Sequence, residues 1–463
     1  MESPASRRAK LLPKKQNKSE VEGTVRKLPE PLISRILSFL PTKDAVRTCV
    51  LSKKWVYRWT FITKLHLDDS VFFYPKKKTG GKQHFVNFVY RALLLTKIST
   101  LDGFSLVIAN KYDASLVNTW ICCILNRGVK NLRVNSHSEI SFSALTSHSL
   151  FNSKLLEELM LEMCCCGIKV TTTFVHFGHL KILKLSGIVF SLEPSIGPEF
   201  LTLSLPVLKE FVTVNCTWLS AKVITLKVPL LERVIIEQDA KSLSHDTLRD
   251  ITFSALHLRE FTYYGDGCIS HYFALLDGSS AYNASLNVIL KQCEGNIDLK
   301  TVFRACHLLE QFSQVKNLKF EGSMVLLTLL EVTNLPLFGM LTHLELGLVT
   351  CEVLLGLLLR SPVLETLVFK GVSKFQNELL NSTAVPRCLT SSLQVVKFEK
   401  LHGFEHELCL AKFMMENGLV LQRMSFSLAY QGLGKSKAIE EFKKKLFSFK
   451  KGFSFAIVEF SYD

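Results

Sequence analysis

The sequence predicts an α/β protein in which a small N-terminal helical module precedes a long solenoid of repeats. Two observations lead to this fold class. An apolar-x-x-apolar-x-apolar motif recurs along most of the 463 residues at intervals in the twenties. A block at 28–60 instead shows apolar residues at helical spacing, with Pro41 breaking the pattern. A period in the twenties is typical of leucine-rich repeats, in which a short strand alternates with a helical or irregular return.

Each copy of the repeat motif predicts one strand of the solenoid. The second and third apolar positions are two residues apart, so both side chains point into the core, and stacked units bury a continuous spine. A sandwich of evenly spaced strands is the alternative, but its strands would recur roughly every 8–12 residues. The copies begin at Val129, Leu156, Leu180, Leu208, Leu231, Leu258, Val315, Leu341, Leu364, Leu393 and Leu421, and a degraded copy from Leu286 fills the longest gap.

The residue between the two inward positions of each strand must face outward, on the concave side of the solenoid. This row consists of Arg133, Met160, Lys184, Val212, Ile235, Thr262, Lys319, Glu345, Val368, Lys397 and Ser425. It mixes charges with aliphatic side chains, whereas a row kept only for solubility would be more uniformly polar. The alternative is that a long loop or the C-terminal segment covers part of this face. The candidates for binding a target protein are Arg133, Met160, Lys184, Ile235, Lys319, Glu345 and Lys397.

The block at 28–60 predicts three short helices. The first ends at Pro41, Thr42 can cap the second, and Ser52 can cap the third. A block of this length is below the size at which a chain usually folds alone, so its apolar surface needs a cover. One interpretation is that it simply caps the open end of the first repeat. The apolar positions are Leu32, Ile33, Ile36, Leu37 and Leu40 in the first helix, Val46, Cys49 and Val50 in the second, and Trp55, Val56 and Trp59 in the third.

The same block resembles the F-box of plant F-box proteins. Two positions depart from the family pattern: Cys49 stands where serine is usual, and Arg58 stands where leucine is common. The motifs that carry the resemblance are Leu28-Pro29, "ILSFLPTKDAV" from Ile36, "VLSKKW" from Val50 and the final Trp59.

The C-terminal part resembles the FBD domain, which accompanies F-boxes and leucine-rich repeats in this family. The resemblance begins at Cys388, includes Gly403, a helix through Leu410 and a strand around Met424, and closes with "FSFAIVEF" from Phe453. The expected organisation is therefore a basic, disordered tail at 1–27, an F-box at 28–70, leucine-rich repeats at 71–385, and an FBD-like segment at 386–463 that continues the stack.

The resemblance implies the substrate-recognition subunit of an SCF-type (Skp–cullin–F-box) ubiquitin ligase. In such a subunit the F-box binds a Skp-type adaptor, the adaptor joins the cullin and RING subunits, and the repeats hold a target protein. Catalysis is then by positioning, and the chain itself is not an enzyme. Two alternatives remain: a leucine-rich-repeat scaffold that acts without ubiquitin transfer, and a hydrolase with a cryptic site. The implied adaptor-binding residues are Leu28, Pro29, Leu32, Ile36, Leu37, Leu40, Pro41, Val46, Leu51, Trp55 and Trp59.

The net charge of +15 is not arranged as a nucleic-acid groove. The excess lies in residues 1–27, 28–60, 71–82 and 431–452, and the remaining body is slightly acidic. A groove for nucleic acid would need a continuous basic stripe with aromatic residues interleaved. The most apolar window, Met324–Met340, is too short and too polar to span a bilayer. We therefore expect neither nucleic acid nor a membrane as partner.

The N-terminus indicates a location in the nucleus and cytoplasm. It has no apolar core of signal-peptide length, and the thirteen scattered cysteines are best interpreted as free thiols of a reducing compartment. Two basic clusters, Arg7-Arg8 and Lys14-Lys15, are compatible with nuclear import, although a solvated tail explains them equally well.

No residue set predicts catalytic chemistry, a metal or a cofactor. The contiguous cysteines at 122–123 and 164–166 are unsuited to one tetrahedral zinc ion. His402 and His406 enclose Gly403 and a misplaced Glu405, which differs from the helical His-Glu-x-x-His order of metalloproteases. His176 and His179 fall in a predicted loop. We expect no metal site.

Overall fold

The computed structural model divides into two compact units. The first unit ends at Leu106, and the second begins at Val107. The first unit extends beyond the expected F-box boundary at residue 70. The basic tail with Arg7, Arg8, Lys14 and Lys15 lies outside the described residues, as does Leu28. The structure describes residues 29–73, 80–137, 150, 153–170, 172–192, 200–219, 221–239, 249–276, 283–291, 298–332, 335–372, 384–428, 436–450 and 457–462.

The first unit is built from short helices packed beside two strands. Its first helix, α2, begins directly after Pro29 and buries Ile33 and Leu37, as the helical spacing predicts. Prolines at the start of a helix are well tolerated because the missing N–H has no intrahelical acceptor there. The elements are α2 (Glu30–Leu37), α3 (Thr42–Arg47), η1 (Thr48–Val50), η2 (Lys53–Trp55), η3 (Arg58–Phe61), β1 (Lys64–Asp68), η4 (Ser70–Phe72), α4 (Gly81–Leu95) and β2 (Leu101–Ile108), whose last two residues lie beyond the boundary at Leu106.

Two of the predicted helix caps in this unit are wrong. Thr42 is the first residue of α3 rather than its cap, and its buried hydroxyl accepts a hydrogen bond from the His66 amide at 2.8 Å. Ser52 precedes η2 without a side-chain capping bond, and the third helix is two short 3₁₀ segments instead of one α-helix. The aromatic-rich and β-branched stretch there has weak helix propensity, so tertiary packing decides its conformation.

The second unit is dominated by one long, all-parallel sheet. Its strands follow chain order, and β9 pairs with β6 beside the main path. The strands are β3 (Val129–Ser136), β4 (Glu158–Val170), β6 (Ile182–Leu192), β8 (Glu210–Val214), β9 (Thr217–Leu219), β11 (Arg233–Gln238), β13 (Glu260–Gly265), β15 (Ser285–Leu290), β16 (Asn317–Glu321), β17 (His343–Val349), β18 (Thr366–Val372), β19 (Val395–Leu401), β20 (Arg423–Leu428) and β21 (Ile457–Tyr462).

The returns between these strands change character along the unit. In the central repeats they form a second parallel sheet, ordered β14-β12-β10-β7-β5. These strands are β5 (Phe174–His176), β7 (Phe200–Ser204), β10 (Val223–Lys227), β12 (Asp250–Ser254) and β14 (Tyr272–Leu275). The other returns include the helices α5 (Ala114–Asn126), α7 (Leu299–Gln311), α8 (Ser323–Val332), α9 (Cys351–Leu359), α11 (Arg387–Ser391), α12 (Glu405–Asn417) and α13 (Ser436–Lys450).

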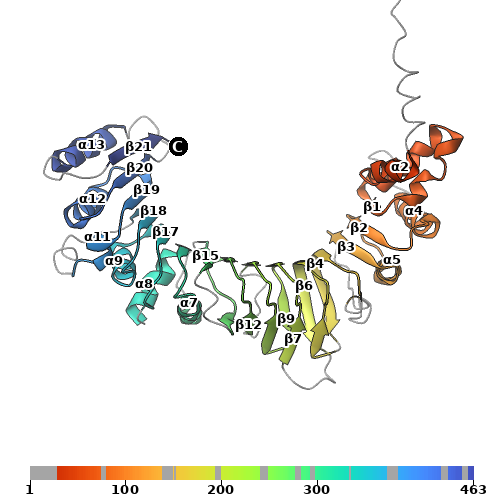
Figure 1. The fold of residues 1–463 in the computed structure, drawn as a ribbon, viewed down its shortest axis with the longest axis horizontal. Helices are drawn as coiled ribbons and strands as arrows, with labels where there is room; N and C mark the ends of the chain where they lie inside the picture. Colours follow the sequence, from red (N-terminus) through yellow and green to blue (C-terminus); the bar gives the residue numbers. More distant parts are fainter. Residues whose placement is uncertain are drawn as a thin grey trace, which may run out of the picture. The chain divides into compact units, whose positions relative to one another are not determined.

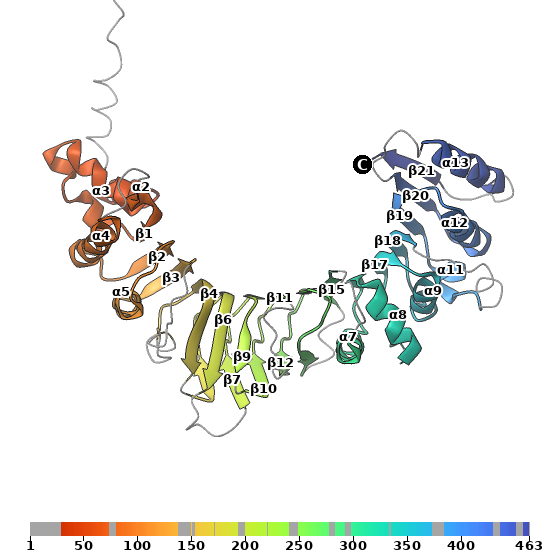
Figure 2. The ribbon, with the colours of Figure 1, turned by 180° about the vertical axis from the view of Figure 1, so that it is seen from behind.

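Helices and second sheet lie on the same side of the main sheet (Figures 1 and 2). Among the described elements of the second unit, the other side of the main sheet therefore has no covering layer. We call it the open face. This layering follows from the repeat, because inward-pointing residues of each strand must be buried by the return segments.

The repeat pattern is confirmed at nearly every copy, with one error of frame. Strands begin at or two residues after each predicted start, and the second and third apolar positions are buried. The degraded copy is the exception: β15 aligns Leu286 with Phe261 and Leu318, so Leu286 occupies the second apolar position. The unit therefore starts three residues earlier, at Asn283, where the expected apolar residue is missing. The polar residue at that position hid the correct frame.

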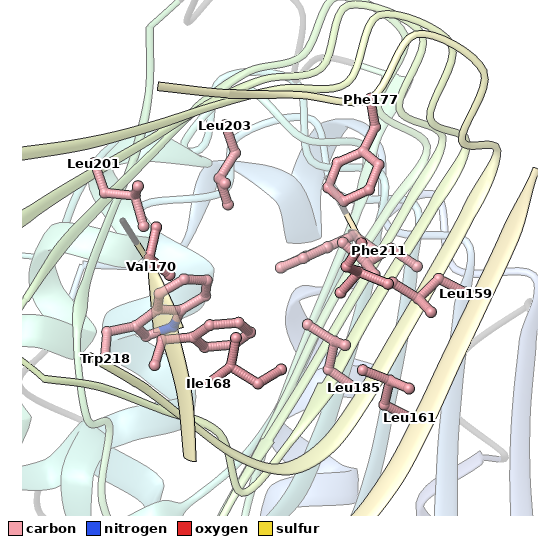
Figure 3. Close-up of a pocket in the computed structure, with 13 residues that line it drawn as sticks. Leu159, Leu161, Ile168, Val170, Phe177, Leu185, Leu201, Leu203, Phe211 and Trp218 are labelled. Atoms are coloured by element: carbon pink, nitrogen blue, oxygen red, sulfur yellow. The ribbon is translucent and has the colours of Figure 1, made fainter. Parts of the chain in front are cut away.

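The core of the central repeats contains a small cavity of about 40 Å³. Only apolar side chains line it, and they converge from both sheets, as Figure 3 shows for Val170, Leu203, Phe211 and Trp218. The rings of Phe190 and Trp218 stack at 4.2 Å between centroids on one side of it. Because its lining offers no polar partner, the cavity is not a water site.

Candidate docking surfaces

The first unit exposes an apolar stripe on α2. Ile33 and Leu37 point inward, whereas Leu32 and Ile36 lie on the outer side, with Ile36 52% exposed. Leu40, just after the helix, continues the stripe and is also exposed. These positions are four residues apart, so they share one side of a helix. The structure thus divides the single apolar face expected from the sequence into an inner half and an outer half.

The remaining predicted adaptor-binding residues divide in the same way. Leu51 is 65% exposed, and Pro29 and Pro41 are exposed as well. Val46 and Trp55 are half-buried, whereas Trp59 is buried with only 6% exposure. Leu37 and Trp59 therefore support the outer surface from within the unit. We call the exposed set the α2 surface; it comprises Pro29, Leu32, Ile36, Leu40, Pro41 and Leu51.

Sequence reasoning missed two strongly exposed apolar residues of this unit. Phe39 is 75% exposed and Val50 87% exposed. Val50 was expected among the apolar positions of the second helix but was not included in the adaptor-binding set; it lies in the 3₁₀ segment η1, where the α-helical spacing no longer applies. Phe39 follows the end of α2 and lines a groove of about 810 Å³ with Arg35, Phe61 and Asp102. Phe39 lies three residues after Ile36, so the helical spacing of the stripe was a signal that could have identified it.

The two departures from the F-box pattern both have structural partners. The Arg58 guanidinium forms an ion pair with Glu30 at 2.6 Å and lies over the Trp55 ring at 5.1 Å from its centroid. The arginine thus ties the end of the block to the start of α2. The Cys49 thiol donates a hydrogen bond to the Val56 carbonyl, with sulfur and oxygen 3.1 Å apart. Neither departure leaves an unpaired polar group in the unit.

In the second unit, the predicted outward row is one continuous line across the main sheet. Strand pairing aligns each member with the next, from Arg133 with Met160 at one end to Lys397 with Ser425 at the other. The row also contains Asn287 and Glu459, which the sequence analysis left out. Asn287 was missed because of the frame error, and Glu459 because its strand lacks the complete motif.

Several charges of the row are already paired within the open face. Lys184 pairs with Glu210 at 3.0 Å, and Arg133 lies 3.6 Å from Glu158. Lys319 forms ion pairs with both Glu345 and Glu321. Such partly exposed pairs contribute little to stability, but they leave the charges less available for a partner. Lys397 is exposed.

The aliphatic members of the row are not equally accessible. Val368 was expected to be exposed, but it is buried, and so is Thr262. Thr262 accepts a hydrogen bond from the Asn287 side chain at 3.0 Å, so the neighbouring strand covers it. Met160, Val212 and Ile235 are half-buried, as expected for residues on a sheet face flanked by longer side chains. They form the apolar centre of the open face, with Lys184 and Glu210 beside them.

His402 and His406 take part in hydrogen bonds at the start of α12. The buried Glu407 carboxylate accepts hydrogen bonds from the backbone N–H of His402 at 3.2 Å and of Phe404 at 2.8 Å. His406 is bonded through Nε2 to the Val372 carbonyl at 2.9 Å. Gly403 has φ +82°, and a side chain there would press on the backbone of Ala438. Within the described ranges, no cluster of three His, Cys, Asp or Glu is placed to hold a metal.

None of the helices in the described part of the chain is both long and apolar enough to cross a membrane. This includes α8 and α9, the two most apolar helices, which have 10 and 9 residues. Both bury apolar side chains against the main sheet or neighbouring helices.

A helical module with an exposed apolar surface, followed by stacked parallel strands that leave one sheet face open, defines a leucine-rich-repeat type of protein with an N-terminal helical module. The model of the F-box domain matches residues 26–60, and that of the FBD domain matches residues 381–426. The chain belongs to the plant F-box/LRR-repeat proteins and carries a C-terminal FBD domain.

Three relatives from Arabidopsis thaliana illustrate this membership. One F-box/LRR-repeat protein is 30% identical over 357 residues, covering 74% of this chain and 91% of the relative. A second is 28% identical over 413 residues, covering 86% of each chain. A putative F-box/FBD/LRR-repeat protein is 29% identical over 431 residues, covering 86% of this chain and 82% of the relative.

Proposed function

We propose that this chain is the substrate-recognition subunit of an SCF-type ubiquitin ligase. The F-box binds a Skp-type adaptor, which brings the cullin and RING subunits, and the open face of the repeats holds a target protein. The chain contributes position rather than catalytic groups. The observation that carries the proposal is the F-box match at 26–60, together with the exposed apolar side chains of the α2 surface in that block.

The physical basis of adaptor binding is the burial of this apolar surface. Contiguous exposed apolar side chains on a small helical unit are typical of interaction sites. The positive charge of residues 28–60 favours an acidic partner at the rim of the contact, where charge acts mainly on association rate. A scaffold that acts without ubiquitin transfer would use the same open face but would not require this surface to bind an adaptor.

The test is the double variant Ile36→Asp with Leu51→Asp. Both side chains are exposed, so the unit should still fold, while two buried charges in the interface should abolish co-purification with a Skp-type adaptor. The matched control is Leu94→Asp, which charges an equally apolar and exposed residue of α4 and should keep adaptor binding. Adaptor binding at the wild-type level in the double variant would exclude the proposed role of the α2 surface.

We also propose localisation in nucleus and cytoplasm, supported by the two basic clusters of the N-terminal tail. Replacing Arg7, Arg8, Lys14 and Lys15 with alanine should shift a fluorescently tagged chain toward the cytoplasm, because import receptors recognise clustered basic residues. An unchanged nuclear fraction would leave these residues as a solvated tail.

A further inference from the structure

The open face of the second unit carries an excess of negative charge in its central part. On β4, β6, β8, β11, β13 and β15, the outward row and the two rows that flank it hold five glutamates but only one lysine and one arginine, a net charge of −3. The neighbouring strands β16–β18 instead balance two glutamates with two lysines, which pair with each other. The five glutamates are Glu158, Glu162, Glu210, Glu237 and Glu260.

The two basic residues of these rows are already used within the face. Lys184 pairs with Glu210 at 3.0 Å, and Arg233 pairs with Glu260 at 2.9 Å. Glu158 lies 3.6 Å from an arginine of β3. Three of the five glutamates therefore have a basic partner on their own or a neighbouring strand.

The unbalanced charge belongs to Glu162 on β4 and Glu237 on β11. Within the described part of the chain, neither carboxylate forms an ion pair. Glu162 is exposed and accepts a hydrogen bond from the Asn135 amide, which leaves its charge in place. Both lie in one flanking row, separated by Ser186 and Val214. Three strand spacings place their backbones about 14 Å apart, too far to share one metal ion.

Apolar side chains surround the two carboxylates. Met160 and Ile235, from the apolar centre of the open face, stand two residues before Glu162 and Glu237 on the same strands and point to the same side. Tyr264 follows Glu237 in the flanking row and is 39% exposed. A partner that covers the apolar centre therefore also removes both carboxylates from water. Without a cation to meet them, that desolvation is costly.

We propose that the open face recognises a basic segment of the target protein, in which two Lys or Arg residues flank apolar ones. This inference rests on the proposed function, because it names the chemistry of the target at that same face. The two cations pair with Glu162 and Glu237, and the apolar residues pack on Val214 and the apolar centre. In an extended segment, residues four apart lie about 13 Å apart on one side, which matches the spacing of the two carboxylates. Neutral and acidic segments are rejected because they leave both carboxylates buried and unpaired.

The experiment selects binders of the full chain from a random dodecapeptide library displayed on phage. The enriched peptides should carry two Lys or Arg with apolar residues between them. Measured by fluorescence anisotropy, they should bind the double variant Glu162→Gln with Glu237→Gln at least tenfold more weakly than wild type. Glutamine keeps the size of each side chain, and both positions face outward, so the fold should be unchanged. The matched control, Asp250→Asn with Glu331→Gln, removes two exposed acids elsewhere in the second unit and should keep wild-type affinity.

The proposal is overturned if no peptide is enriched, if enriched peptides have no excess of Lys and Arg, or if the double glutamine variant binds them normally. Dimerisation of the wild type that this variant loses, measured by sedimentation velocity, would assign the face to a second copy instead. Adaptor co-purification should be normal in the double glutamine variant, so it tests the proposed function separately. Targets lost in Ile235→Glu but kept in the double glutamine variant would retain the open face as the target site and reject only its preference for basic segments.

Discussion

His271 is enclosed just before β14 with only 4% of its surface exposed. Burial, reinforced by the positive charges of Arg304 and Arg249, lowers the pKa of the imidazole to about 3. Arg304 is itself buried and donates to the Ile269 carbonyl at 2.6 Å. The Tyr263 hydroxyl, whose pKa burial raises to about 12, accepts from the Ser270 amide at 3.0 Å. In the connection between β13 and β14, His271 and Tyr263 therefore stay neutral beside the charged Arg304.

The first prediction concerns acid stability. The unfolded chain binds a proton at His271 near pH 6.5, but the folded chain does not until about pH 3, so stability falls as pH falls through this interval. At about 1.4 kcal/mol per pH unit, His271 should account for a loss of about 2 kcal/mol between pH 7 and pH 5.

Urea unfolding at both pH values measures this effect. His271→Gln, which cannot titrate, should lose about 2 kcal/mol less than wild type over the same interval. His84→Gln, at an exposed position on α4, should keep the wild-type loss. Equal losses in wild type and His271→Gln would contradict the assignment.

At the scale of elements, strands were predictable from the sequence and returns were not. Strand positions follow from the two inward apolar residues of each repeat, and Asn283, at a position where an apolar residue was expected, concealed the frame of β15. The return segments β10 and α9 both bury apolar residues, although one is a strand and the other a helix. In segments this short, hydrophobicity alone therefore does not predict whether a return forms a strand or a helix. On the α2 surface, spacing identified Ile36 but could not say that Leu37 and Trp59 turn inward, because that depends on packing within the unit.

The packing between the two sheets supports a second prediction, at the cavity of about 40 Å³. Val170→Leu adds one methylene from β4 into this space (Figure 3). Filling should stabilise the chain by up to about 1 kcal/mol, since cavity volume costs about 24 cal/mol per Å³. The urea midpoint measures this.

A matched control separates cavity filling from a general effect of larger side chains. Val234 on β11 is fully buried and does not line the cavity. Val234→Leu should therefore destabilise by about 1–3 kcal/mol through overpacking. If both variants destabilised equally, the space between the sheets would already be filled in solution.

At the scale of the whole molecule, the surfaces proposed for adaptor binding and for target binding belong to different units. The α2 surface belongs to the unit ending at Leu106, and the open face belongs to the unit beginning at Val107. Each unit buries its own apolar residues, so a substitution on one surface leaves the other intact. The charged candidates are poor probes of the open face, because reversing Lys184 would also place two negative charges beside each other at Glu210.

The apolar centre of the open face gives the cleaner test of target binding. Ile235 lies next to Val212 in the row and is half-buried, so a partner that covers this centre would bury its side chain completely. Ile235→Glu should weaken target capture at least tenfold, because a desolvated carboxylate without a partner costs several kcal/mol. Thr252→Glu, at an outward position of β12 on the second sheet, is the matched control and should capture targets normally. Proximity labelling under proteasome inhibition measures capture, and co-purification with the adaptor should be unchanged in both variants. Targets retained by Ile235→Glu at the wild-type level would move recognition away from the open face, to the loops or to the FBD domain.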